Sequence, residues 1–143
     1  MDRHGWIDEK LTAVPLFAGL DKKHLRQISS LATQIDVREG KVLTREGEHG
    51  NEFIIILEGE AEVRIGENLI ATRGAGDYFG EIALVANRPR TATVVAKTPM
   101  KVEVIGRREF QTMLHDNPTI ATELLGVAAD RIAENDGQLN ASA

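Results

Sequence analysis

The residues best suited to chemistry lie between Gly76 and Ala96, in the segment GDYFGEIALVANRPRTATVVA. Gly76 and Asp77 are a turn signal, and the residues after Gly80 can form one helical turn. Arg90 then stands at the start of a run rich in β-branched residues. The start of a helix offers unpaired backbone N–H groups, and an arginine adds a planar fork of donors. Together these features predict a binding site for one small anion, such as a phosphate.

Glu81 is the unexpected member of this set, because a carboxylate should repel a phosphate. Its presence is explained if it accepts a hydrogen bond from a hydroxyl group, such as the 2′-hydroxyl of a ribose. The alternative is purely structural. In that case Arg90 is a charge at a strand edge and Glu81 a carboxylate at a helix N-terminus.

Composition narrows the class of protein further. A chain of 143 residues with 42% hydrophobic residues has the size of one globular domain. It has no cysteine, which excludes disulfides and thiolate metal sites. The formal net charge of −5 argues against unassisted nucleic-acid binding, though not against a small anionic ligand. No apolar run has membrane-spanning length and the N-terminus lacks a signal-peptide core, so we expect no membrane segment and a cytoplasmic location.

The hydrophobic pattern changes along the chain. A helical lead-in occupies 1–32, where Asp21 is expected to cap a helix with Leu25 and Ile28 on its apolar face. From 33 to 106, short apolar segments punctuated by glycines predict the strands of a β-barrel or jelly roll.

Two helices are predicted after the strands. The first covers 107–115, and the second begins at Pro118 and ends near Glu134. The remaining residues, 136–143, are small and polar, and we expect them to be disordered.

The segment around Arg90 closely resembles the phosphate-binding cassette of cyclic nucleotide-binding domains. The family pattern F-G-E-[LI]-A-L followed by P-R-[STA]-A-[ST]-V is matched here by 79–84 and 89–94. The lead-in PLFAGLDKKHLRQISSLA and the glycine spacing of 40–63 are similar to the family as well, so the resemblance runs from Pro15 to Arg131. It implies a mainly β fold with flanking helices, namely an eight-stranded β-roll over 33–106 that holds the cassette, 76–96. An N-terminal helical bundle precedes the roll, and hinge and lid helices over 107–135 follow it.

The resemblance also implies a ligand and the residues that bind it. The ligand is a 3′,5′-cyclic nucleotide, with cAMP favoured over cGMP by similarity to bacterial members of the family. Backbone N–H groups and Arg90 would hold the phosphate, and Glu81 with the Gly80 backbone would hold the ribose 2′-hydroxyl. The implied cassette residues are Phe79, Gly80, Glu81, Ile82, Ala83, Arg90, Thr91 and Ala92. Apolar residues near Val63, Ile65 and Val94 would flank the base.

Two residues keep alternative interpretations. Thr91 can contact the phosphate, or can favour cGMP by contacting the guanine amino group. Arg131 is either a surface charge near the end of the last helix or part of a lid whose guanidinium stacks on the purine.

The implied function is that of a sensor, not an enzyme, in which ligand favours the closed position of the last helix. It needs no cofactor beyond the cyclic nucleotide. No DNA-binding domain is recognised in this chain, so the output would pass to a protein effector in cis or in trans. The chain would be either a stand-alone sensor or one domain of a larger protein.

Two other classes are alternatives. A protein-interaction module with a degenerate pocket would share the fold, but the intact Gly80-Glu81 and Arg90 argue against it. A cupin-type metal enzyme would share the small barrel. However, the matching region, 48–52, holds one histidine rather than two, and the other histidines are scattered.

Overall fold

The structure, a computed structural model, describes residues 11–85 and 88–142. Its elements follow the order that the hydrophobic pattern predicts. The helical elements are η1 (Pro15–Phe17), α2 (Lys22–Leu31), α3 (Glu81–Val85), α4 (Arg107–Asp116) and α5 (Pro118–Ser142). The strands are β1 (Ala32–Val37), β2 (Val42–Thr44), β3 (Glu52–Glu58), β4 (Ala61–Ile65), β5 (Asn68–Arg73), β6 (Tyr78–Phe79), β7 (Thr93–Ala96) and β8 (Met100–Gly106).

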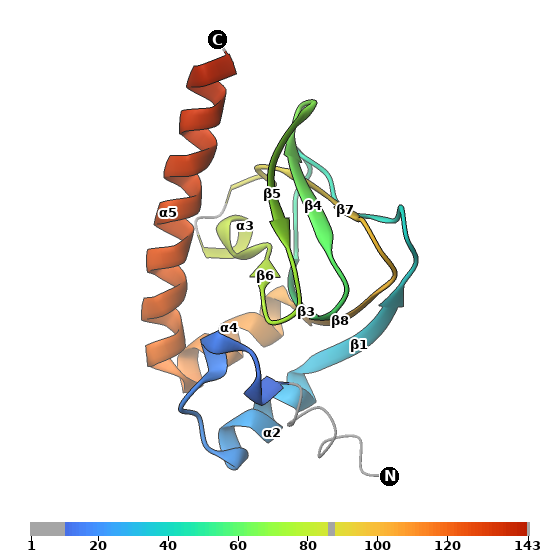
Figure 1. Cartoon of the computed structure of the whole chain (residues 1–143). Coiled ribbons are helices and arrows are strands. Elements are labelled where there is room, and N and C mark those ends of the chain that lie inside the picture. The colour runs from blue at the N-terminus through green and yellow to red at the C-terminus, as the bar shows by residue number, and fades with distance from the viewer. Residues whose placement is uncertain (1–10, 86–87, 143) are drawn as a thin grey trace.

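The strands form two antiparallel sheets of four, in the orders β1-β8-β3-β6 and β2-β7-β4-β5. Figure 1 shows the sheets facing each other, with α2 and α4 gathered at one end and α5 standing along one side. The short helix α3 lies between α5 and the strands. The predicted eight-stranded fold with two C-terminal helices is therefore confirmed.

Strand β3 explains how one chain builds two apolar clusters. Phe53 and Ile55 pack with helical residues such as Phe110, whereas Ile54 and Ile56 point between the two sheets. Because alternate side chains of a strand face opposite ways, a strand covered on both faces becomes a continuous apolar run. All five residues from 53 to 57 are buried. This strand supports the helices on one face and the interior of the roll on the other.

The helical ends agree with the sequence in part. Asp21 caps α2 as predicted, because its Oδ1 accepts a hydrogen bond from the His24 backbone at 2.9 Å. Asn117 lies directly before Pro118, the position of an N-cap, and its carbonyl accepts from the Ile120 N–H at 3.0 Å and the Ala121 N–H at 3.4 Å. Its Nδ2 also donates to the Met113 carbonyl at 2.9 Å and so closes the end of α4. The predicted N-terminal bundle stays a prediction, since residues 1–10 lie outside the described part.

The predicted end of the last helix is wrong. The sequence placed it near Glu134 with a disordered tail over 136–143, but α5 continues to Ser142 and residue 143 lies outside the described part. Small polar residues do not end a helix by themselves. This segment has no proline, and Gln138, Leu139 and Ala141 favour helix. In the described residues, no helix is long and apolar enough to cross a membrane.

Candidate cyclic nucleotide site

An open cavity lies where α3, α5 and the second sheet, β2-β7-β4-β5, meet, with about 510 Å³ of empty space. Its lining combines apolar strand residues with three arginines and one carboxylate. The residues are Thr44, Val63, Ile70, Arg73, Phe79, Gly80, Glu81, Ile82, Arg90, Thr91, Ala92, Val94 and Arg131. A mainly apolar cavity with a few converging polar groups is typical of a small-molecule site. Within 11–85 and 88–142, no three His, Cys, Asp or Glu side chains gather so as to hold a metal ion.

Arg90 is the buried cation of this cavity, with 8% of its surface exposed. Its Nη1 donates to the Gly80 carbonyl at 3.2 Å, and its Nη2 donates to the Glu52 carbonyl at 2.8 Å. Burial lowers the pKa of Arg90 from its ordinary value, while the charges of Glu52 and Glu81 oppose this effect. No carboxylate of the described residues hydrogen-bonds to this guanidinium, so its charge is oriented by dipoles and left available to an anion.

Gly80 allows Arg90 to lie this close to the backbone. Its φ of +98° belongs to the left-handed region that favours glycine. A Cβ there would lie 2.7 Å from both Arg90 Nη1 and the Glu52 carbonyl oxygen. The glycine between β6 and α3 is therefore required both for the turn and for the space that the guanidinium fills.

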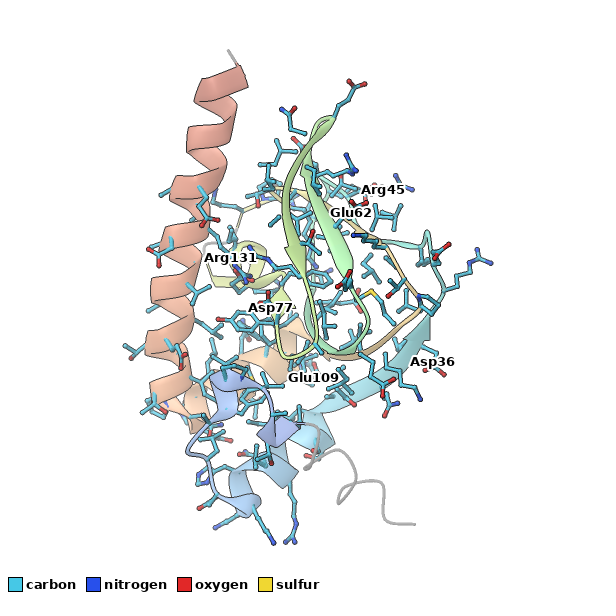
Figure 2. The ribbon with its side chains drawn as sticks, in the orientation of Figure 1. Asp36, Arg45, Glu62, Asp77, Glu109 and Arg131 are labelled. Carbon is cyan, nitrogen blue, oxygen red and sulfur yellow. The ribbon has the colours of Figure 1, made fainter. Side chains whose placement is uncertain are left out.

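Glu81 and Arg131 form the second polar centre. Arg131 Nη1 donates to Glu81 Oε1 at 2.7 Å and to the Tyr78 carbonyl at 2.9 Å. Arg131 Nη2 donates to Asp77 Oδ1 at 3.2 Å, and the guanidinium carbon lies 5.0 Å from the centre of the Tyr78 ring. Figure 2 shows Arg131 reaching from α5 towards Asp77 and the strands. Glu81 is 1% exposed, so this pair links α5 to α3 in a poorly hydrated place.

A comparison of the sequence with known families agrees with the fold. The family model described as "Cyclic nucleotide-binding domain" matches residues 34–117. This range includes Arg90 and Glu81, whereas Arg131 lies after it. The chain belongs to the cyclic nucleotide-binding domain family.

Three relatives illustrate this membership. The cAMP-dependent protein kinase regulatory subunit of Yarrowia lipolytica is 38% identical over 136 residues, covering 94% of this chain and 33% of that protein. The subunit of the same name from Schizosaccharomyces pombe is 37% identical, covering 73% of this chain and 26% of its own length. The regulatory domain of Toxoplasma gondii PKA, solved with cAMP, has a TM-score of 0.78 and 28% identity over 90% of this chain and 50% of that chain. This domain thus spans a third or less of the two curated relatives.

Most residues that the sequence predicted for the site gather around the cavity. Among the predicted cassette residues and Arg131, all but Ala83 line it, and the side chain of Ala83 lies outside the described part. Val63 and Val94 also line it, whereas Ile65 lies next to the β4–β5 turn, opposite Asn68, and packs between the sheets.

Three lining residues escaped the sequence reasoning. Thr44 lies in β2 and donates to the Ala92 carbonyl at 3.2 Å. Ile70 and Arg73 come from β5, and Arg73 pairs with Asp77 at 3.7 Å. Pairing with β4 places Ala71 and Arg73 on the same face as Val63 and Ala61, and a register shift between Val63 and Arg64 lets Ile70 reach the cavity as well. The sequence reveals neither the pairing partner of β5 nor this register shift, so it could not assign these residues to the cavity.

Proposed function

We propose that this domain binds a 3′,5′-cyclic nucleotide reversibly, preferring cAMP to cGMP, and does not hydrolyse it. The buried guanidinium of Arg90 carries the proposal, because it is fixed by two neutral carbonyls beside an open cavity. A cyclic phosphate has one negative charge and two exposed oxygens, which suit a pre-oriented fork of N–H donors. The backbone N–H groups of Gly80, Ile82 and Ala83 would complete the phosphate site.

Glu81 would accept the hydrogen bond of the ribose 2′-hydroxyl. Its Oε1 already accepts from Arg131, so the carboxylate is held in one orientation. A carboxylate has several lone-pair directions and can serve a second donor. This arrangement separates the two jobs of the site: Arg90 for the anion and Glu81 for the sugar.

Binding would favour the position of α5 seen here. Arg131 connects α5 to Glu81, so a ligand that orders Glu81 has a higher affinity for the docked helix than for the undocked one. The prediction that Arg131 also stacks on the purine remains a proposal. One face of its guanidinium covers the Tyr78 ring, and a base would use the opposite face.

The output would pass from α5 to a protein effector in cis or in trans, and the domain would act as a regulatory sensor. The named relatives are regulatory subunits of a kinase, which supports a regulatory role for this domain. Thr91 lines the cavity, and its hydroxyl is the group through which cGMP could compete with cAMP.

Calorimetric titration with cAMP, cGMP and 5′-AMP tests the proposal. Wild type should bind a cyclic nucleotide and should form no AMP from cAMP. Arg90→Ala should weaken binding at least about tenfold, because a charged hydrogen bond contributes roughly 1.5–3 kcal/mol. Arg88→Ala is the matched control: Arg88 is exposed and precedes the strand, so its loss should change affinity less than about twofold.

Absence of binding by wild type would refute the proposal, and equal losses for the two variants would show that Arg90 does not hold the phosphate. Amide hydrogen exchange tests the role of α5 separately. Ligand should protect residues 118–134, and unchanged exchange there would rule out stabilisation of α5 by binding.

A further inference from the structure

Arg107, the first residue of α4, forms side-chain hydrogen bonds with residues outside its own helix. Its Nη2 donates to the Gly50 carbonyl at 3.1 Å, and its Nε donates to Asn51 Oδ1 at 3.3 Å. Pairing of β3 with β8 places Glu52 opposite Gly106, which brings the start of α4 next to the segment 50–52. A cation in the first turn of a helix is disfavoured by the helix dipole. The position of Arg107 is therefore better explained by the segment it holds than by the helix it begins.

The same segment forms the wall against which Arg90 lies. Gly50 is buried, and a Cβ there would lie 1.9 Å from Arg90 Nε. The Glu52 carbonyl accepts from Arg90 Nη2 at 2.8 Å. The backbone of Arg90 is also bound to the preceding residues, since its N–H donates to Glu48 and its carbonyl accepts from Gly47, both at 2.8 Å. Arg107 thus contacts, from the α4 side, the two residues that precede the carbonyl holding Arg90.

We propose that Arg107 is a positioning residue for anion binding: it fixes segment 50–52 so that the guanidinium of Arg90 faces the cavity. Arg107 itself is not among the residues that line the cavity, so it acts through Arg90. The inference rests on the proposed function, because a displaced Arg90 lowers ligand affinity only if Arg90 binds the anionic ligand. The competing explanation is that Arg107 only ties α4 to β3, in which case its loss would lower stability without a specific effect on Arg90.

A double-mutant cycle separates these explanations. Arg107→Ala should weaken cyclic nucleotide binding about tenfold, since two hydrogen bonds that orient the segment are lost. Arg108→Ala removes the same charge from the next, exposed position and should change affinity less than about twofold. Arg107→Lys should recover only part of the loss, because one ammonium group cannot reproduce the fork that reaches Gly50 and Asn51. In the Arg90→Ala background, Arg107→Ala should have almost no further effect.

A second readout needs no ligand. The Nε–H resonance of Arg90 in the NMR spectrum should shift or broaden in Arg107→Ala and, more weakly, in Arg107→Lys, but not in Arg108→Ala. If wild type binds no cyclic nucleotide and this resonance still responds, the proposed function fails and the positioning role of Arg107 stands. The positioning role is overturned by an unchanged resonance, by losses that add fully to that of Arg90→Ala, or by full rescue with lysine. If Arg107→Ala does not fold, the ligand affinity and the Arg90 Nε–H resonance of Arg107→Lys decide between the two explanations.

Discussion

Arg131→Ala is the substitution that tests most directly how α5 is attached to the site. Only 13% of the Arg131 side chain is exposed, and its partner Glu81 is 1% exposed. The substitution removes the donor to Glu81 and to the Tyr78 carbonyl, and it also removes the pair with Asp77. The carboxylate of Glu81 is then left buried without its cation. An uncompensated buried charge strongly destabilises the folded state.

The expected loss of stability follows from the burial of this ion pair. Removing one partner of a buried pair destabilises proteins by about 3–5 kcal/mol, and we expect about 3 kcal/mol here because Asp77 is partly exposed and rehydrates. For a chain of this length that loss corresponds to a melting temperature lower by roughly 10 °C. In the Glu81→Gln background, Arg131→Ala leaves no unpaired buried carboxylate. The loss of unfolding free energy caused by Arg131→Ala should therefore be about 2 kcal/mol smaller than in wild type.

Denaturant unfolding of the single and double variants measures both quantities. Asp130→Ala is the control, because Asp130 is the exposed neighbour of Arg131 on α5, and its effect should stay within about 0.5 kcal/mol. The reasoning is refuted if Arg131→Ala unfolds like this control, or if the losses of Arg131→Ala and Glu81→Gln are additive. Titration of the same variant tests stacking on the base, which predicts an affinity loss between about twofold and thirtyfold.

Three further predictions concern single groups. Glu81→Gln should lower the affinity for cAMP but scarcely for 2′-deoxy-cAMP, and equal losses would assign the carboxylate another role. Gly50→Ala should displace Arg90 and weaken cAMP binding at least about tenfold, whereas Gly126→Ala, whose Cβ meets nothing within 4 Å, should leave affinity unchanged and stabilise α5 by about 0.5–1 kcal/mol. Burial raises the pKa of Tyr78 from 10.0 to about 12, so the folded chain keeps a proton that the unfolded chain loses, and stability should fall as pH rises through this range. Tyrosinate absorbance measures this pKa directly because the chain has one tyrosine, and a midpoint near 10 would contradict it.

The sequence was sufficient for the parts of the fold that depend on local pattern. Glycine turns and short apolar segments predicted the strands. The unbroken apolar run of 53–57 is the strand β3, and the structure shows why it does not alternate: it is buried on both faces. The cassette was recognised by resemblance, because 79–84 and 89–94 together match the family pattern in order and spacing. The roles of Gly80, Glu81 and Arg90 in binding stay predictions.

The contacts between distant segments could not be predicted in this way. Arg131 was weighed as a surface charge or a base contact, but its guanidinium lies between Glu81 and Asp77, about 50 residues earlier in the chain. Arg107 and Arg108 form a short charge cluster of the kind that usually lies in solvent, yet Arg107 binds Gly50 across the β3–β8 pairing. In each case the partner is set by the register of the sheets and the path of a helix, which no short stretch of sequence encodes.

These long-range contacts suggest how the two C-terminal helices act together. Arg107 of α4 contacts the wall that holds Arg90, and Arg131 of α5 holds Glu81. The helices are joined by one residue, Asn117, which is 4% exposed and bonded to the end of α4. A change in the angle between α4 and α5 therefore cannot leave both contacts intact. A ligand that requires Arg90 and Glu81 at the same time would bind this one helix arrangement best, and that difference in affinity is what a switch needs.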